Sequence, residues 1–176
     1  HSREVGSATY VMRGQVELAG HPSVTFEETF SGDAATVMAG LYLSGPLTAL
    51  LSNGFGPVTV EGVDVSVTAY DDVRTAQIER VWLDDPRPRP GRTVPLRIVA
   101  RTHRGDEISR TIMVDIPASA RGRLQLLVSD GATLAQLERQ QSGQGIQATS
   151  LNQLIEALND ARRNNRLYVQ LVRQDA

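Results

Sequence analysis

The sequence predicts an α+β fold: a β-hairpin with apolar helices, a β-sandwich of the immunoglobulin or fibronectin kind in the middle, and a helical C-terminal part that ends in a strand. Two patterns carry this prediction. Apolar and polar residues alternate with period two over residues 8–18 and again from residue 57, as in half-buried strands. Between them, residues 34–60 carry no charge and space their apolar residues as helices do. The composition, 40% apolar and 22% charged over 176 residues, is that of a globular protein with a sizeable core.

Three segments are expected, and they differ in charge. Residues 1–72 form an α+β segment, residues 73–130 form the sandwich-like segment, and residues 131–176 supply helices and a closing strand packed on the first segment. Residues 1–73 contain nine acids and two Arg, whereas residues 74–123 contain eleven Arg and six acids. All 18 basic residues are Arg, which excludes lysine chemistry. The net charge of −2 predicts no general attraction to nucleic acid or to anionic membranes.

The first segment is expected to open with an antiparallel hairpin. His21-Pro22 marks its turn. The inward residues of the two strands follow from the alternation: Tyr10, Met12, Gly14, Val16 and Leu18 in the first, and Val24, Phe26 and Phe30 in the second.

The uncharged stretch is expected to form two short buried helices. Asp33 is the expected N-cap of the first helix, and Gly45-Pro46 interrupts the pattern. The apolar residues at helical spacing are Val37, Met38 and Leu41 in the first helix, and Leu47, Leu50 and Leu51 in the second. Pro46, the glycines and the lack of flanking basic residues argue against a membrane span.

Five further strands are expected, at residues 58–70, 75–83, 93–102, 107–117 and 123–130. Val63, Val65 and Val67 share one face of the first of these strands. "DDPRPRPGR", residues 84–92, forms a Pro-rich turn that acts as a domain boundary or a rigid corner.

The last segment is expected to be helical and then extended. Thr133-x-x-Gln136 and Ser150-x-x-Gln153 look like capping boxes, and a loop over residues 140–150 lies between the two helices. Arg162 and Arg163 suit the C-terminal end of a helix dipole, and residues 167–172 close the chain as a strand.

No catalytic, metal-binding or cofactor-binding constellation emerges from the sequence. Cysteine is absent, which removes thiolate chemistry and Cys-based zinc sites. Only His21 and His103 could serve as the base for a nucleophilic Ser, since His1 opens the chain, and neither lies near a nucleophile motif. A hydrolase built on either remains an alternative. The acid pairs Glu27-Glu28, Asp71-Asp72 and Asp84-Asp85 do not form carboxylate dyads, because neighbours on a strand point to opposite faces; the last two pairs are expected to be solvated turns.

"VARTHRGDEISR", residues 99–110, contains the triplet Arg104-Gly105-Asp106 between two predicted strands. The residues favour the turn of a hairpin, with Gly105 supplying a positive φ; an adhesion loop is the alternative. A possible interaction surface combines this tip with the Arg-rich turn and consists of Arg87, Arg89, Arg92, Arg104 and Asp106.

One family resemblance can be stated. "IERVWLDDPRPRPGRTVPLRIVARTHRGDE", "VDIPASARGRLQLLVSDG" and "SLNQLIEALNDARRNNRLYVQL" resemble the C-terminal region of bacterial proteins with a serine peptidase domain of the stage IV sporulation protein B (SpoIVB) type. The Gly-His-x-x-x-Asp and Ser-Gly-Ser-Pro segments expected of that peptidase are absent here, so no catalytic residue carries over. The resemblance implies a piece of a longer polypeptide that lies after the peptidase domain.

These observations lead to two functional hypotheses. The first is a non-catalytic accessory module of an exported, extracytoplasmic peptidase-like protein, with the upstream peptidase domain or another protein as its partner. The second is a free-standing adhesion or ligand-binding module of the cell envelope, which uses the 99–110 hairpin or the Arg-rich face.

Overall fold

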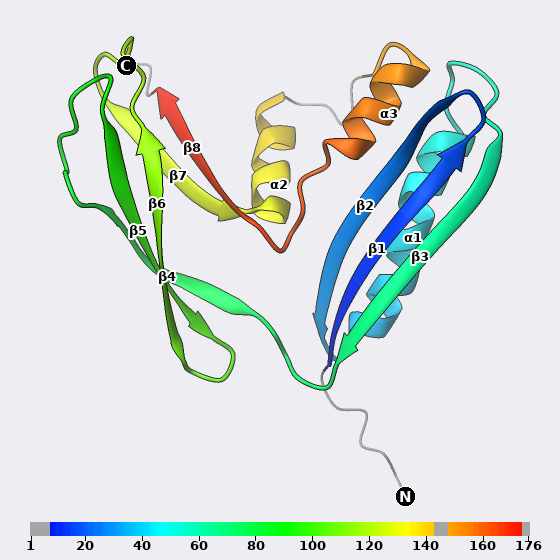
Figure 1. Ribbon diagram of the computed structural model, residues 1–176, viewed down its shortest axis with the longest axis horizontal. Helices are drawn as coiled ribbons and strands as arrows, with labels where there is room; N and C mark the ends of the chain where they lie inside the picture. Colours follow the sequence, from blue (N-terminus) through cyan, green and yellow to red (C-terminus); the bar gives the residue numbers. More distant parts are fainter. Residues whose placement is uncertain (1–7, 143–147, 174–176) are drawn as a thin grey trace, which may run out of the picture. The chain divides into compact units, whose positions relative to one another are not determined.

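The computed structural model describes residues 8–142 and 148–173, which fall into two units (Figure 1). Unit 1 comprises the residues up to Val73 and residues 130–167, and unit 2 comprises residues 74–129 and those from Tyr168 onward. The described residues form eight strands and three helices. The prediction of a mixed, strand-rich α+β fold is therefore confirmed. His1 and part of the predicted loop at residues 140–150 lie outside the described residues.

Unit 1 is built on an antiparallel sheet in the order β2-β1-β3. These strands are β1 (Ala8–Leu18), β2 (His21–Gly32) and β3 (Val60–Tyr70). The hairpin turn between β1 and β2 lies at residues 19–20 and not at the predicted His21-Pro22, because Gly20 adopts the positive φ of 72° that a tight turn requires.

Two helices cover one face of this sheet, α1 (Ala35–Leu51) and α3 (Leu151–Asn159). Figure 1 shows α1 behind the sheet, where it contacts β1 and β2, and α3 packs against β2. The hairpin residues expected to point inward do so. The buried core of the unit consists of Met12, Val16, Leu18, Val24, Phe26, Ala39, Leu50 and Ile155.

The uncharged stretch forms one helix, so the prediction of two helices was wrong. Helix α1 continues through Pro46, and its N-cap is Ala34 without a side-chain hydrogen bond, not Asp33. Pro46 lacks the N–H that would bond the carbonyl four residues earlier. Continuing the helix nevertheless lets Tyr42 and Leu50 pack on the same sheet. Although the first helix was expected to be buried, its apolar residues at helical spacing, Val37, Met38 and Leu41, are exposed.

The N-terminal ends of α2 (Gly131–Ser142) and α3 show which residue caps each helix. The Thr133 box was wrong: the Thr133 N–H donates to Oδ1 of Asp130 at 2.6 Å, so the Asp precedes the helix as its cap. Ser150 is confirmed as the N-cap of α3, since the Gln153 N–H donates to its Oγ at 3.3 Å. The return bond of the predicted box is displaced by one residue, because Oε1 of Gln153 accepts from the Thr149 N–H at 2.9 Å. Because α3 ends at Asn159, Arg162 and Arg163 lie beyond it.

Unit 2 contains a three-stranded sheet in the order β4-β5-β6 and a two-stranded sheet of β7 and β8. The strands are β4 (Ala76–Leu83), β5 (Thr93–Thr102), β6 (Glu107–Asp115), β7 (Leu124–Asp130) and β8 (Leu167–Arg173). Both sheets contribute to one core, which includes Leu96, Ile98, Val114, Leu126, Val169 and Leu171. The arrangement is sandwich-like. An immunoglobulin or fibronectin plan is not confirmed, because the described residues of unit 2 form five strands and an immunoglobulin domain has at least seven.

Two connections differ from expectation. Strand β8 was expected to pack with the helices on the first segment; it pairs with β7, and its alternating Val169 and Leu171 join the core of unit 2. The Pro-rich turn at residues 84–92 lies inside unit 2, so it is a corner and not a domain boundary. Hydrogen bonds of 2.9 Å from Gly91 N to Ile116 O and from Ile116 N to Arg92 O tie this corner to the end of β6.

Candidate functional site

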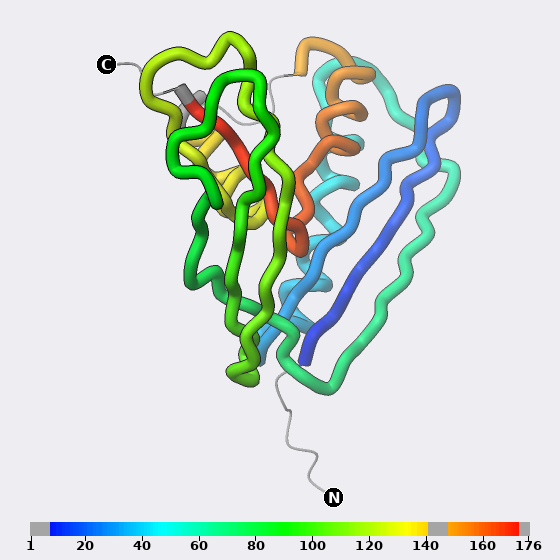
Figure 2. The backbone as a smooth tube through the Cα atoms, turned by 60° about the vertical axis from the view of Figure 1, so that its left-hand side comes forward, coloured from blue at the N-terminus to red at the C-terminus, as the bar shows by residue number. Residues whose placement is uncertain are grey.

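The Arg104-Gly105-Asp106 triplet is the turn of the β5–β6 hairpin, which Figure 2 follows along the backbone. The Gly105 N–H donates to the carbonyl of Thr102 at 2.9 Å, and the Asp106 N–H donates to Oγ1 of Thr102 at 3.0 Å. Gly105 has a φ of 93°, which side-chain-bearing residues rarely adopt. The turn residues are therefore explained by local geometry.

The five residues of the predicted interaction surface do not come together. Arg87, Arg89 and Arg92 are exposed in the corner before β5, whereas Arg104 and Asp106 are exposed at the hairpin tip after it. A strand of this length separates its ends by about 30 Å. The prediction of a single Arg-rich surface is not supported by this placement.

The arginines on β5 are neutralised within unit 2. Arg97 makes a bidentate contact with Asp84 at 2.7 and 2.9 Å, and Arg101 does the same with Glu79 at 2.6 and 3.0 Å. The hydrogen bond from Arg97 lowers the pKa of Asp84, and that from Arg101 lowers the pKa of Glu79. Asp84 is thus an ion-pair partner and not the solvated turn residue that the sequence suggested. Both arginines of β5 therefore have an acidic partner within unit 2.

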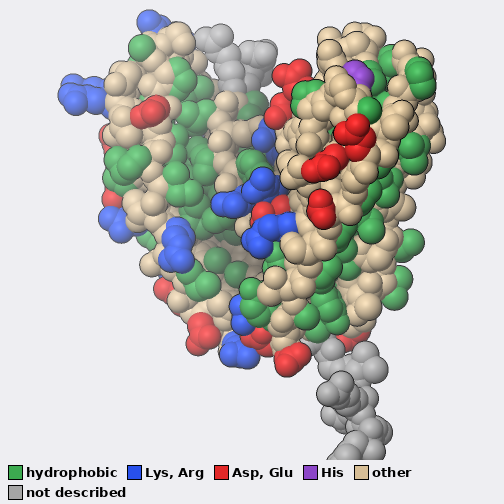
Figure 3. All heavy atoms as spheres, turned by 45° about the vertical axis from the view of Figure 1, so that its right-hand side comes forward, with side chains coloured by type: hydrophobic (Ala, Val, Ile, Leu, Met, Phe, Trp, Pro, Cys, Tyr) green, Lys and Arg blue, Asp and Glu red, His purple; other side chains and the backbone are tan. Residues whose placement is uncertain are grey.

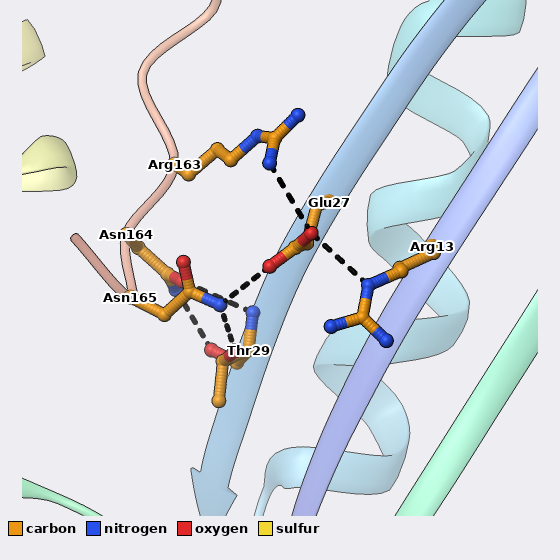
Figure 4. Close-up of polar contacts among 6 residues, drawn as sticks. All are labelled: Arg13, Glu27, Thr29, Arg163, Asn164 and Asn165. Atoms are coloured by element: carbon orange, nitrogen blue, oxygen red, sulfur yellow. Dashed lines mark hydrogen bonds and ion pairs between the residues drawn. The ribbon is translucent and has the colours of Figure 1, made fainter.

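Glu27 is the centre of a polar cluster on the face of the unit 1 sheet opposite α1 (Figure 4). Its side chain is only 9% exposed and accepts from Arg13 Nε at 3.0 Å and Asn165 Nδ2 at 2.8 Å. Arg163 Nη1 lies 3.4 Å away. The hydrogen bond from Asn165, followed by the interactions with Arg13, lowers the pKa of Glu27. The carboxylate is saturated with donors, which indicates a structural anchor and not a reactive group.

Glu28 points to the other face, toward Tyr42 on α1. Burial raises the pKa of Glu28, and burial together with the neighbouring carboxyl raises the pKa of Tyr42 to about 12. The Tyr42 ring also makes edge-to-face contacts with Phe26 and Phe30, at centroid distances of 6.1 and 5.5 Å. The neighbours Glu27 and Glu28 thus lie on opposite faces, as predicted for adjacent strand residues.

The two described histidines have different surroundings. His103 is exposed beside the hairpin tip. His21 lines a cleft of about 600 Å³ in unit 1, whose other lining residues are Gly20, Pro22, Asn152, Ile155, Glu156 and Asn159. None of these side chains carries a hydroxyl or thiol nucleophile, so the cleft does not complete a triad. Within residues 8–142 and 148–173, no cluster of three or more His, Asp or Glu is placed to hold a metal ion.

The feature that sequence reasoning missed is an uncovered apolar strand in unit 1. Val63, Val65 and Val67, here called the valine edge, lie opposite Val16, Gly14 and Met12 of β1 and so share the helix-bearing face. They are nevertheless 43%, 40% and 51% exposed, because α1 and α3 pack over β1 and β2. Hydrophobic side chains reach the surface of this unit in the right-hand part of Figure 3. The alternation of residues 58–70 predicted an apolar face but not whether anything covers it.

The backbone of β3 is also unpaired along its outer side. In β2, Thr25 and Thr29 direct their N–H groups away from β1, toward Asn159 and Asn164. Alternate residues of an antiparallel strand direct their backbone groups to opposite sides. The registers of β2 with β1 and of β1 with β3 then place the N–H and C=O groups of the valine edge on the open side. No described residue forms a hydrogen bond with this side between Gly62 and Ala69.

Among the residues that the structure describes, no helix has both the length and the apolar content needed to cross a membrane. Comparisons with models of protein families, with curated protein sequences and with solved structures found no match.

Proposed function

We propose that this chain is a non-catalytic accessory module that binds an extended polypeptide strand along the valine edge of β3, within an exported bacterial protein of the SpoIVB peptidase type. The observation that carries the binding role is the coincidence of unpaired backbone groups and uncovered valines on one strand. Strand addition uses both at once: main-chain hydrogen bonds supply affinity, and alternate side chains supply specificity. The peptidase context rests on the sequence resemblance.

The partner strand has a defined chemistry. Its residues alternate, with apolar side chains on the helix-bearing face beside the three valines. The opposite face of β3 presents Asp64, Ser66 and Thr68, so the partner residue directly opposite Asp64 carries a hydroxyl or basic side chain and not an acid. In the peptidase context this strand belongs to the peptidase domain or to another exported protein.

A random peptide display library tests the binding role. With the chain immobilised at low density, we expect enriched peptides to carry apolar residues at alternate positions. Val65→Asp places a charge in the middle of the valine edge and should abolish their binding. Leu41→Asp is the matched control, since it places the same charge on another exposed apolar residue, on α1, and should leave binding intact. No enrichment, or equal binding by both variants, would contradict the proposal.

Two further measurements test the remaining parts. Peptidase activity of the purified chain, absent from a preparation of an inactive control protein, would overturn the non-catalytic role. Sequencing the reading frame upstream of residue 1 tests the context: Gly-His-x-x-x-Asp and Ser-Gly-Ser-Pro segments would support it. A start codon or a bare signal peptide there would favour the free-standing module instead.

A further inference from the structure

We propose that the strand which occupies the valine edge is β3 of a second copy of this chain, paired antiparallel about a two-fold axis at Val65. This inference rests on the proposed function, because it names the partner of the same edge. The pairing would join two three-stranded sheets into one continuous six-stranded sheet with two-fold symmetry.

The backbone geometry suits this axis. With Val65 opposite Val65 of the second copy, Val63 lies opposite the second copy's Val67. The N–H and C=O groups of these valines face the open side of β3. In this register the N–H groups of one copy therefore lie opposite the C=O groups of the other. The stretch from Gly62 to Tyr70 pairs with β1 without a bulge, and so does not twist away from a partner.

The side chains favour the same register. All three valines meet valines, and Asp64 meets Ser66 of the second copy, so no acid lies directly opposite an acid. An axis at Asp64 would place two Asp64 carboxylates opposite each other. An axis at Ser66 would place Glu61 opposite Asp71 and leave Val63 opposite Ala69. The strand also lacks the Lys and Pro residues with which proteins usually prevent edge pairing.

Other occupants fit less well. A strand from an unrelated protein would have to provide the same spacing of three apolar residues, which the second copy possesses by identity. Two described asparagines of unit 1, Asn159 and Asn164, bond the opposite edge of the sheet, along β2, and not the valine edge.

Because the chain contains no cysteine, single-cysteine variants give an unambiguous test. A short bifunctional thiol reagent should link Val65→Cys to itself, since the two side chains are directly opposite. It should not link Val63→Cys to itself, because these side chains are about 13 Å apart along the strands. A mixture of Val63→Cys and Val67→Cys should yield the mixed dimer.

Sedimentation equilibrium supplies the second readout. The full chain should show a concentration-dependent dimer between roughly 1 and 500 µM. Val65→Asp should remove it while leaving the circular dichroism spectrum unchanged, and Leu41→Asp should retain it. A monomer throughout this range, or a dimer that Val65→Asp does not weaken, would overturn the inference.

The two proposals fail differently. Peptide enrichment at low chain concentration together with a monomeric chain would retain strand binding and reject the second copy as partner. A dimer linked through Val65→Cys without peptide enrichment would retain the second copy and restrict the edge to self-association.

Discussion

The two outer strands of the unit 1 sheet differ in how their edges are treated. The edge of β2 is closed by side-chain amides. Asn164 accepts from the Thr29 N–H at 3.0 Å and donates to the Thr29 carbonyl at 2.7 Å, and Asn159 accepts from the Thr25 N–H and donates to the Ser23 carbonyl. The edge of β3 receives no such bonds from the described residues.

This difference shows what an open edge means in this molecule. The asparagines that close the edge of β2 lie more than 130 positions away along the chain. They bond the edge of β2 and not that of β3. Unprotected edges invite pairing with another chain, and proteins usually prevent it. The open edge with its three exposed valines, beside an edge that asparagines close, is the contrast on which the proposed strand binding rests.

The largest expected effect comes from opening the closed edge. Asn164→Ala removes both bonds to the Thr29 backbone and leaves a half-buried N–H and C=O without partners. We expect the free energy of unfolding to fall by about 2 to 3 kcal/mol. Asn152→Ala, on the exposed side of α3, is the control and should change stability by less than about 0.5 kcal/mol. Urea denaturation followed by circular dichroism measures both, and equal stabilities would show that the amide bonds do not hold β2.

A matched pair of valine truncations compares the two strands directly. Val24 in β2 is 1% exposed and Val65 in β3 is 40% exposed, although both lie on the helix-bearing face. Val24→Ala should lower the free energy of unfolding by about 2 kcal/mol through lost burial and a cavity. Val65→Ala should cost about 0.5 kcal/mol in the dilute monomer. Similar costs would mean that β3 is covered in solution even at low concentration.

The adjacent carboxyls of Glu27 and Glu28 on β2 should change the free energy of unfolding with pH in opposite directions. The pKa of Glu27 is lowered in the folded protein, so its contribution to stability is present above the ordinary glutamate pKa of 4.5 and is lost as the pH falls through the folded pKa. The pKa of Glu28 is raised by burial, so stability falls as the pH rises from 4.5 through its folded pKa.

The corresponding glutamine variants test this. Glu27→Gln should destabilise the protein at pH 7 by about 1 kcal/mol, and by less at pH 3, because it weakens the bonds from Arg13 and Asn165. Glu28→Gln should stabilise it at pH 7 and change it little at pH 4. Urea unfolding midpoints of both variants, measured from pH 3 to pH 7, test these expectations. A change in stability of the same sign for both variants at pH 7 would contradict the assignment of the two side chains to different environments.

The smallest effect requires no substitution. Amide exchange followed by NMR at low protein concentration should find the Thr29 N–H protected by Asn164 and the Val65 N–H exposed to solvent. The N–H of Ser66, which faces β1, serves as the internal reference and should be protected. Slow exchange at Val65 that disappears on dilution would sharpen the comparison, because it would report the pairing of two β3 edges.

Local patterns predicted the strands of this protein well. The alternation of residues 8–18 matches β1, and that of residues 93–102 matches β5. Gly105 was recognised as a turn residue because its requirement for a positive φ is a local one. Helix α1 was not predicted as a single helix, since Pro46 is a local stop signal that packing on the sheet overrode.

The candidate site was not predicted, and the physical reason is the same throughout. The sequence by itself determined which residues alternate, which face of β3 is apolar, where tight turns occur, and that no cysteine or lysine chemistry is possible. Only the tertiary structure decided that α1 and α3 cover β1 and β2 but not the valine edge, that the predicted arginine surface divides between the two ends of β5, and that distant asparagines close the edge of β2. A period-two pattern specifies an apolar face through the geometry of one strand, whereas burial of that face depends on elements far away in the chain.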